Sequence, residues 1–473
     1  MAHIVVIGGG ISGLSTAYHL WKIKKERNLD LKITLVEAAS RLGGVINSEQ
    51  EQGYVVEHGP DAFLVEKPWA LTLCEELNLK PYLIAAPEGK GKAFVAWRGE
   101  LAALPEGFSM IAPSRFWPFV TSPLFSPMGK LRAFGDLFLP KGNRQKDDES
   151  VARFIKRRLG AELFERAGQA LVGGIYTADA GMLSASSAIP RFVELEREHG
   201  SIIRGLRGQR LGTTVGGARY SLFQTLVNGL SGLVEGLALS LEKETIVLGA
   251  EISEVARGAS GWLVCKADET IAADGIVLAV PALRAARLLK GIDASLSRTL
   301  AEIESVASVV INFLLNADQI SRPANGFGFV VPISEHANIL AASFISEKYA
   351  NRAPKGMVMV RVFIGGALMP QLFKKADQDL ISLALTDLQK YLKLKGAPVK
   401  TWIKRFPDSM PQYHLGHAKR VAQIEQQVRE LSGLALAGNC YHGVGIPDCV
   451  KSGEVAAKAV LESLAKRGLI PES

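Results

Sequence analysis

The sequence predicts an α/β fold that opens with a strand, a glycine-rich turn and a helix. Residues 4–7 form a continuous apolar run, which is typical of a parallel strand buried on both faces. Residues 8–13 read Gly-Gly-Gly-Ile-Ser-Gly, and apolar residues at helical spacing follow from Leu14 to Trp21. A second apolar run at 33–36 completes a β-α-β unit, from which parallel sheets are built.

The glycine turn has the spacing G-x-G-x-x-G in the strand–turn–helix context where this pattern binds a dinucleotide. Gly8 allows the tight turn, Gly10 lets the backbone approach a pyrophosphate, and Gly13 lets the helix pack closely on the sheet. Unpaired N–H groups at the start of the helix then face the phosphates. Glu37 ends the second strand, where a carboxylate binds an adenosine ribose and repels a 2′-phosphate, which disfavours NADP. These features predict a Rossmann-like domain.

The segment after Glu37 narrows the cofactor. Residues 37–44 read Glu-Ala-Ala-Ser-Arg-Leu-Gly-Gly, which resembles the E-A-x-x-R-x-G-G stretch of the FAD-dependent amine oxidase and phytoene desaturase superfamily. In that superfamily the diglycine allows backbone to approach the cofactor, and the arginine, here Arg41, reaches its phosphates. The resemblance therefore implies FAD rather than NAD.

The C-terminal segment supports the same cofactor. Residues 443–448 read Gly-Val-Gly-Ile-Pro-Asp, and a helix is predicted to begin at Pro447 and to stop at Gly468. In the superfamily the last helix points its N-terminus at the isoalloxazine ring. The positive end of the helix dipole stabilises the negative charge of the reduced flavin there.

A tighter resemblance covers nearly the whole chain. The sequence resembles the oxygen-dependent porphyrinogen oxidases of haem biosynthesis, most closely those of Gram-positive bacteria. The motifs that carry the likeness are residues 4–13, 34–44, Glu57-His58-Gly59-Pro60-Asp61, 173–176 with Leu183-Ser184, Met410-Pro411-Gln412-Tyr413-His414 and 443–448. One departure is Thr177-Ala178-Asp179, where that family has Ala-Gly-Asp.

The resemblance implies an FAD-dependent oxidase that converts coproporphyrinogen III to coproporphyrin III and also oxidises protoporphyrinogen IX. The oxidation removes six electrons and FAD carries two at a time, so three cycles are needed, and each reduces one O₂ to H₂O₂. No catalytic side chain and no metal is then expected. The cofactor-binding residues implied are Gly8, Gly9, Gly10, Ile11, Ser12, Gly13, Glu37, Ala38, Arg41, Gly43, Gly44, Gly59, Pro60, Asp61, Ala62, Ile252, Phe406, Gly445, Ile446, Pro447 and Asp448. Phe406 is a departure, since close relatives carry tryptophan there.

The substrate has an apolar macrocycle and charged propionates, so an apolar cavity with cations at its rim is expected. Lys67 is the first candidate cation, because it directly follows the Gly59 segment and the family places a lysine there. Arg98, beside Trp97, is the second, and Tyr176 is a candidate for packing on the macrocycle. A solvated surface lysine and a core tyrosine remain the alternatives.

The FAD-binding domain is expected to be discontinuous. It takes residues 1–65, 216–300 and 405–473, while a mixed α+β substrate domain takes residues 66–100 and 301–404. A helical, aromatic-rich region takes residues 101–215. Within these ranges, residues 262–273 predict a hairpin and the glycine-rich stretch 205–217 predicts a loop.

Aromatic side chains are dense between 108 and 138, namely Phe108, Phe116, Trp117, Phe119, Phe125, Phe134 and Phe138. Such a segment lines a core, a cavity or a membrane face. The likeness to haem-pathway enzymes leaves open a peripheral contact with the inner face of a membrane and a contact with other enzymes of that pathway.

Composition bounds the remaining alternatives. The chain has 473 residues, 48% of them hydrophobic and 22% charged, and its net charge is +8. Neither a nucleic-acid motif nor a C-x-x-C pair accompanies this charge, so no nucleic-acid partner, zinc cluster or disulfide is expected. The first residues run straight into a strand, which argues against a secretory signal and for the cytoplasm. The rival functions are another oxidase of the superfamily, acting on an amine, and a non-catalytic porphyrin carrier.

Overall fold

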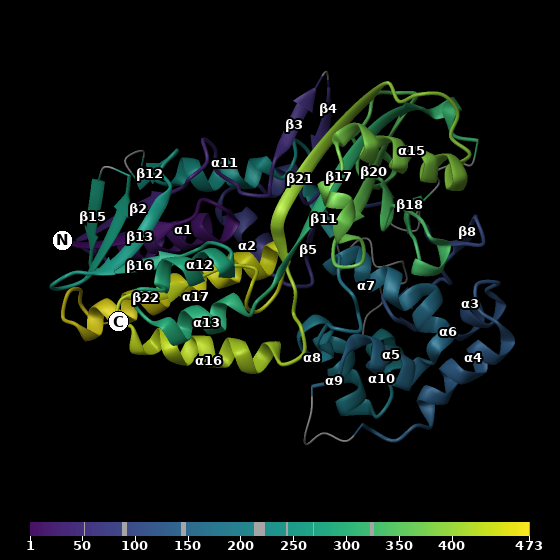
Figure 1. The fold of residues 1–473 in the computed structure, drawn as a ribbon, viewed down its shortest axis with the longest axis horizontal. Coiled ribbons are helices and arrows are strands. Elements are labelled where there is room, and N and C mark those ends of the chain that lie inside the picture. The colour runs from purple at the N-terminus through teal and green to yellow at the C-terminus, as the bar shows by residue number, and fades with distance from the viewer. Residues whose placement is uncertain are drawn as a thin grey trace.

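The computed structural model describes residues 1–51, 53–87, 92–142, 148–211, 223–242, 245–267, 269–321 and 326–472. Figure 1 shows three parts: a parallel sheet with helices around it, a second large sheet, and a group of short helices below that sheet. The two chain ends both lie in the part built around the parallel sheet.

The parallel sheet has five strands in the order β12-β2-β1-β16-β22. Every neighbouring pair in it is parallel. The strands are β1 (Ala2–Ile7), β2 (Leu31–Val36), β12 (Ile246–Val247), β16 (Gly275–Leu278) and β22 (Leu434–Leu436). This arrangement confirms the predicted α/β, Rossmann-like fold, and its strands come from three distant parts of the chain. The exact domain boundaries stay a prediction.

The first and last long helices pack directly on each other beside this sheet. They are α1 (Ile11–Glu26) and α17 (Ile446–Lys466). Ser15 of α1 donates its hydroxyl to the carbonyl of Val450 in α17 at 2.8 Å. A Cβ added to Gly453 would lie 2.5 Å from the carbonyl oxygen of Ser12, so a glycine is needed for this approach. The predicted last helix is confirmed, starting one residue before Pro447 and ending two residues before Gly468.

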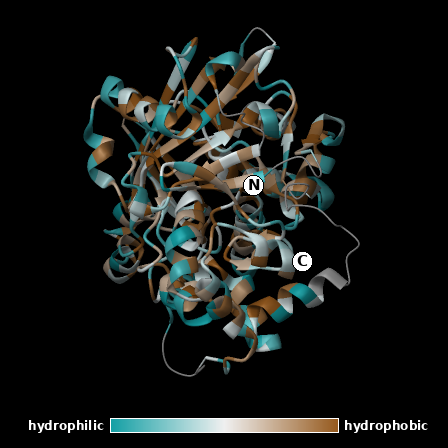
Figure 2. Cartoon of the chain, turned by 90° about the vertical axis from the view of Figure 1, so that its right-hand side faces the viewer, coloured by the Kyte–Doolittle hydropathy of each residue, from teal (hydrophilic) through white to brown (hydrophobic). Residues whose placement is uncertain are grey.

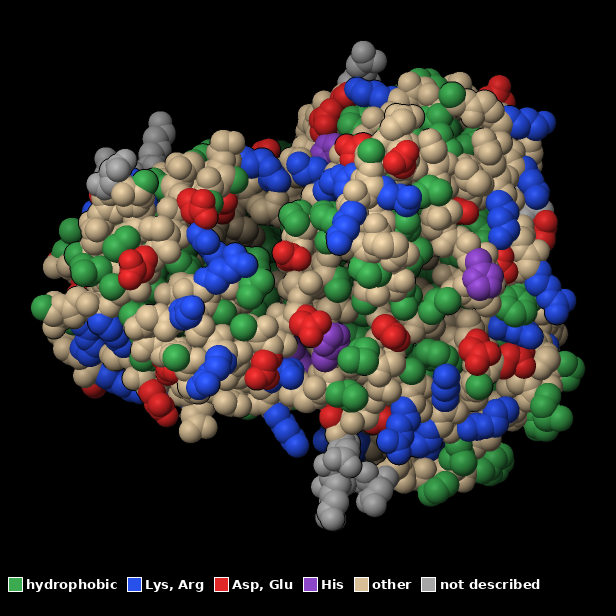
Figure 3. Space-filling view, in the orientation of Figure 1, with side chains coloured by type: hydrophobic (Ala, Val, Ile, Leu, Met, Phe, Trp, Pro, Cys, Tyr) green, Lys and Arg blue, Asp and Glu red, His purple; other side chains and the backbone are tan. Residues whose placement is uncertain are grey.

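The second large sheet has seven strands in the order β21-β17-β20-β19-β18-β7-β8. Its strands are β7 (Lys92–Trp97), β8 (Glu100–Ala103), β17 (Ser305–Asn316), β18 (Gly326–Val330), β19 (Ala341–Phe344), β20 (Met357–Gly365) and β21 (Lys400–Pro411). Helix α15 (Asp377–Leu392) packs its apolar side on one face of the sheet. Figure 3 shows that the molecular surface is hollowed between this sheet and the part that contains the parallel sheet.

Smaller elements connect these sheets. The strands are β3 (Ser48–Glu51), β4 (Tyr54–Glu57), β5 (Phe63–Leu64), β6 (Leu83–Ala85), β9 (Phe108–Ser109), β10 (Ala112–Pro113) and β11 (Phe223–Leu226). The helices are α2 (Trp69–Glu76), α11 (Ser231–Ser240), α12 (Ala282–Leu289), α13 (Ala294–Ala301), α14 (Ile345–Lys348) and α16 (His417–Glu430).

The third part is a bundle of short helices with its own apolar core. Its helices are α3 (Phe116–Thr121), α4 (Pro127–Phe134), α5 (Val151–Leu159), α6 (Ala161–Leu163), α7 (Gln169–Tyr176), α8 (Ala185–Ala188), α9 (Pro190–His199) and α10 (Ile202–Leu211). The loop predicted from residue 205 is therefore wrong as far as Leu211, because burial of Ile203 and Leu206 outweighs the low helix propensity of the glycines. Residues 212–217 lie outside the described residues.

The aromatic side chains of the helical part divide into two groups. Phe119, Phe125 and Phe134 pack together, with ring centroids 5.2 and 5.5 Å from that of Phe119. Trp117 and Phe138 instead are 71% and 86% exposed. Figure 2, which faces this side of the molecule, shows hydrophobic and hydrophilic residues side by side along the helices. In the part of the chain that the structure describes, we find no helix with the length and apolar character needed to cross a bilayer.

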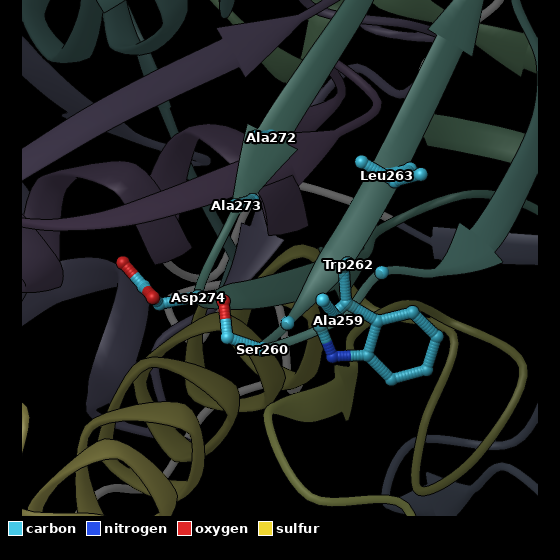
Figure 4. Close-up of a pocket in the computed structure, with 9 residues that line it drawn as sticks. Ala259, Ser260, Trp262, Leu263, Ala272, Ala273 and Asp274 are labelled. Carbon is cyan, nitrogen blue, oxygen red and sulfur yellow. The ribbon is translucent and has the colours of Figure 1, made fainter.

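A three-stranded antiparallel sheet flanks the parallel one. It contains β13 (Ile252–Arg257), β14 (Trp262–Lys266) and β15 (Glu269–Ala273), which confirms the predicted hairpin. A cavity of ≈ 160 Å³ lies at its end, where Trp262 and Asp274 point away from each other (Figure 4). The Asp274 carboxylate accepts a hydrogen bond from the backbone N–H of His3, at the start of β1. This cavity therefore lies at the opposite end of β1 from the glycine turn.

Candidate cofactor site

The glycine turn follows the carboxyl end of β1 and enters α1 directly. Gly8 adopts φ +111°, which a glycine allows without strain. A Cβ on Gly13 would lie 1.8 Å from the carbonyl oxygen of Gly8, so that position brings helix and turn into contact. A Cβ on Gly10 would meet nothing within 4 Å. The open side of the turn is thus at Gly10, where backbone is accessible to a pyrophosphate.

Glu37 lies at the end of β2, next to the glycine turn. Its carboxylate accepts hydrogen bonds from the backbone N–H groups of Gly9 at 2.6 Å and Ala39 at 2.7 Å. The backbone of the same residue is paired with Val247 and Ala250, so the start of β13 at Ile252 is nearby. The structure therefore places Glu37 beside the turn, and the predicted cofactor residue Ile252 follows its partner Ala250 by two positions.

The diglycine at 43–44 is hydrogen-bonded to the glycine turn. The N–H of Gly43 donates to the carbonyl of Gly9 at 2.8 Å, and both residues of the diglycine have positive φ. The Arg41 guanidinium donates to the carbonyls of Leu42, Gly44 and Ile46 at 2.6–3.0 Å. Arg41 therefore braces this turn, a role that the sequence alone does not indicate, and its contact with phosphate stays a prediction.

The Gly59 segment is packed against the diglycine from the other side. A Cβ on Gly59 would lie 1.7 Å from the carbonyl oxygen of Val45. Two residues further on, burial alone would raise the pKa of Asp61, but the charges of Lys348 and Arg361 outweigh it and lower that pKa to about 2. Asp61 is therefore an ionised carboxylate at neutral pH.

The N-terminus of α17 faces the substrate candidate Lys67. The Lys67 ammonium donates to both carboxylate oxygens of Asp448, at 2.6 and 2.7 Å. Asp448 is in the first turn of α17, after the N-cap Gly445. Burial and, after it, the charge of the same carboxylate raise the pKa of Tyr176, so Tyr176 is within electrostatic reach of the Lys67–Asp448 pair. The partner of Lys67 is far away in sequence, and no local signal predicts the pair.

Two further candidates, Arg98 and Phe406, lie on the seven-stranded sheet. Arg98 is on the turn between β7 and β8, at the edge of the seven-stranded sheet, and its backbone N–H donates to Glu335. Phe406 is half-buried on β21, opposite Ser308. Among the described residues, no three His, Cys, Asp or Glu side chains are grouped as a metal site. The four cysteines are free.

Comparison with known proteins identifies the family. Residues 11–461 match the family described as flavin containing amine oxidoreductase. The chain belongs to this family. It is 34% identical to coproporphyrinogen III oxidase of Bacillus subtilis over 98% of each chain. It is 30% identical to human protoporphyrinogen oxidase, over 97% of this chain and 98% of the human protein.

Solved structures agree with this assignment. A crystal structure of a candidate protoporphyrinogen oxidase from Exiguobacterium sp. 255-15 matches with a TM-score of 0.85 and 28% identity, over 97% of this chain and 98% of that one. Cyclohexylamine oxidase from Brevibacterium oxydans matches with a TM-score of 0.70 at 16% identity, which supports the fold alone. The cofactor of this family is FAD, and the open backbone at Gly10 fits it.

The open space at Gly10 generates a prediction about FAD. Changing Gly10 to valine places a side chain where nothing else in the protein lies, so the apoprotein should fold normally. The side chain should instead collide with the pyrophosphate. Overpacking costs about 1–3 kcal/mol, so the affinity for FAD should fall by about fivefold to 150-fold. Titration of apoprotein with FAD, followed by fluorescence, measures this change.

A matched control is Gly291→Val, which also meets nothing within 4 Å but lies in an exposed turn. Both variants should unfold at the same temperature as the parent apoprotein. Full FAD affinity in the Gly10 variant would place the pyrophosphate elsewhere.

Proposed function

We propose that this protein is an FAD-dependent oxidase of haem biosynthesis that converts coproporphyrinogen III to coproporphyrin III and also oxidises protoporphyrinogen IX. The observation that carries the proposal is the full-length likeness to coproporphyrinogen III oxidases, at 34% identity to that of Bacillus subtilis. Bound FAD supplies the redox chemistry: it accepts electrons two at a time and passes them to O₂, so six-electron oxidation takes three cycles.

The residues of the chain have binding and orienting roles in this proposal. At Gly10 and the diglycine the protein backbone can approach the pyrophosphate of FAD. Glu37 binds the ribose, and the N-terminus of α17 faces the isoalloxazine ring. We expect the macrocycle to lie between these elements and the seven-stranded sheet, where the surface is hollowed (Figure 3). A site of this kind works by holding the reacting carbon close to the cofactor in the correct orientation.

The first prediction of this proposal concerns oxygen. The FAD-replete protein should consume three O₂ for each coproporphyrinogen III and yield a fluorescent porphyrin, because each two-electron cycle reduces one O₂. An oxygen electrode and porphyrin fluorescence measure both sides of the reaction. Side-by-side kinetics with protoporphyrinogen IX give the preference between the two substrates.

Two rival functions have distinct outcomes in the same assay. An amine oxidase would consume O₂ with putrescine or a monoamine and not with either porphyrinogen. A porphyrin carrier would bind porphyrin but would not bleach the flavin when a porphyrinogen is added without oxygen. Either result would overturn the proposed activity.

Lys67 is the residue that we propose for a substrate propionate. The Lys67 side chain is 42% exposed, whereas that of Asp448 is only 13% exposed, so the lysine has room for a second anionic partner. Lys67→Ala should raise KM for coproporphyrinogen III by about tenfold, since a hydrogen bond to a charged group contributes about 1.5–3 kcal/mol. The FAD content and kcat should change little.

The control for Lys67 is Lys80→Ala, which removes an exposed ammonium paired with Glu75 at a similar distance of 2.7 Å. Unchanged kinetic constants in the Lys67 variant would remove this residue from the substrate site. If the Lys67 variant lost both FAD and activity, Lys67 would be needed for cofactor binding, through its pair with Asp448, rather than for substrate binding.

We also propose that the exposed apolar residues of α3, α4 and the following turn form a peripheral membrane contact. Trp117, Met128, Leu131 and Phe138 are 67–86% exposed. Figure 3 shows hydrophobic side chains gathered over the helical part with Lys and Arg side chains beside them, which suits an anionic lipid surface. Contact with other enzymes of the haem pathway stays a prediction.

The double variant Trp117→Ser/Phe138→Ser tests the membrane contact. The parent protein should sediment with vesicles that contain phosphatidylglycerol, and the double variant should remain in the supernatant with its activity intact. Leu239→Ser is the control, because Leu239 is equally exposed at 86% but lies on α11. Equal sedimentation of all three proteins would contradict the contact.

A further inference from the structure

A buried group of cations lies directly behind the Gly59–Asp61 segment. The Lys348 ammonium donates to the Asp61 carboxylate at 2.8 Å. The Arg361 guanidinium donates to the carbonyl of Gly59, and its Nη1 is 3.9 Å from the Asp61 carboxylate. The amide of Asn312 donates to the carbonyl of Glu57 at 3.1 Å. Three side chains of the seven-stranded sheet and its neighbouring helix therefore hold one short segment of the cofactor site.

The buried charge of Arg361 destabilises the fold at this position. Its side chain is only 3% exposed, and its Nε and Nη1 make no hydrogen bond with any described residue. Burial lowers its pKa, against the charges of Asp61 and Glu57. A buried donor without a partner destabilises a fold, so the charge of Arg361 calls for a functional explanation.

The charges of this group do not cancel. Lys348, Arg352 and Arg361 lie near two carboxylates, those of Glu57 and Asp61. Burial raises the pKa of Glu57 in spite of its hydrogen bonds with Ser48 and Leu230. The group therefore carries a net positive charge in a region from which water is largely excluded, where charges act over longer distances than at the surface.

The position of this group ties it to the cofactor. Gly59 abuts Val45, Val45 follows the diglycine, and the diglycine is hydrogen-bonded to the glycine turn. Figure 1 shows β4, which leads into the segment, between the parallel-sheet part and the seven-stranded sheet. A cation on β20 can thus influence a flavin bound by the Rossmann-like part, although the two belong to different sheets.

We propose that Arg361 and Lys348 are positioning residues that fix the Gly59–Asp61 segment against the flavin and, through their buried positive charge, favour the reduced cofactor, which is negatively charged. This inference uses the FAD site and does not depend on which substrate the protein oxidises. The Lys67–Asp448 pair is neutral, so the predicted positive potential at that part of the site comes from the N-terminus of α17, and the buried cations are a second source.

The test is the midpoint potential of bound FAD, measured with a reference dye during slow enzymatic reduction. Arg361→Gln and Lys348→Gln should each shift the equilibrium about tenfold toward oxidised flavin, which for two electrons is about 30 mV. Asp61→Asn should shift it in the opposite direction, because it leaves both cations uncompensated. Arg361→Lys keeps the charge and should restore most of the potential.

A control for buried arginine is Arg158→Gln, which removes an equally buried guanidinium, paired with Asp136, in the helical part. It should lower thermal stability without moving the potential. Shifts of the same sign for Arg361→Gln and Asp61→Asn would mean that both only distort the segment, and would overturn the electrostatic role. If Arg361→Gln does not fold, Lys348→Gln and Asp61→Asn still give the two opposite signs. Failure of porphyrinogen turnover in the parent protein would leave these potentials measurable and would count only against the proposed activity.

Discussion

The cofactor site depends on backbone segments that approach each other more closely than any side chain would allow. An added Cβ would lie 1.8 Å from a carbonyl oxygen at Gly13, 1.7 Å at Gly59 and 2.5 Å at Gly453. These glycines join α1 to its own turn, the Gly59 segment to the diglycine, and α17 to α1. Side-chain packing tolerates a lost methylene at moderate cost, but a backbone contact of this kind has no smaller substitute. The whole site is therefore positioned by a few places where only glycine fits.

Electrostatics adds a second constraint. Asp448 in the first turn of α17 stabilises its own helix by about 0.3–1 kcal/mol through the helix dipole. A bare carboxylate at that place would repel an anionic substrate. The ion pair with Lys67 removes this conflict, since the helix keeps its favourable charge while the site as a whole stays neutral there. Asp61 is compensated in the same manner by Lys348 at 2.8 Å. Asp448 and Asp61 are thus each paired with a buried or half-buried cation.

The sequence predicts best those features whose cause is local. The glycine turn, the hairpin in 262–273 and both ends of α17 follow from residues within a few positions of each other, and the structure agrees with them. The pairs Lys67–Asp448 and Arg361–Gly59 join residues 381 and 302 positions apart, and no pattern in a single sequence indicates them. Arg41 is intermediate, because its motif is visible while its bracing of the diglycine is not. The loop predicted at 205–211 is wrong because the burial of Ile203 and Leu206, a tertiary effect, outweighs the local signal of the glycines.

The order of strands in the parallel sheet also links cofactor binding to stability. The edge strand β22 and the helix α17 come from the last part of the chain, yet they complete a sheet and a helix pair begun by the first residues. The site therefore cannot form until both ends of the chain are in place, and the entropy of closing so long a loop opposes this step. FAD binds only the assembled arrangement, so it stabilises the fold by mass action. Because the predicted cofactor residues lie at the starts of both α1 and α17, bound FAD would hold together two segments that are far apart in the sequence.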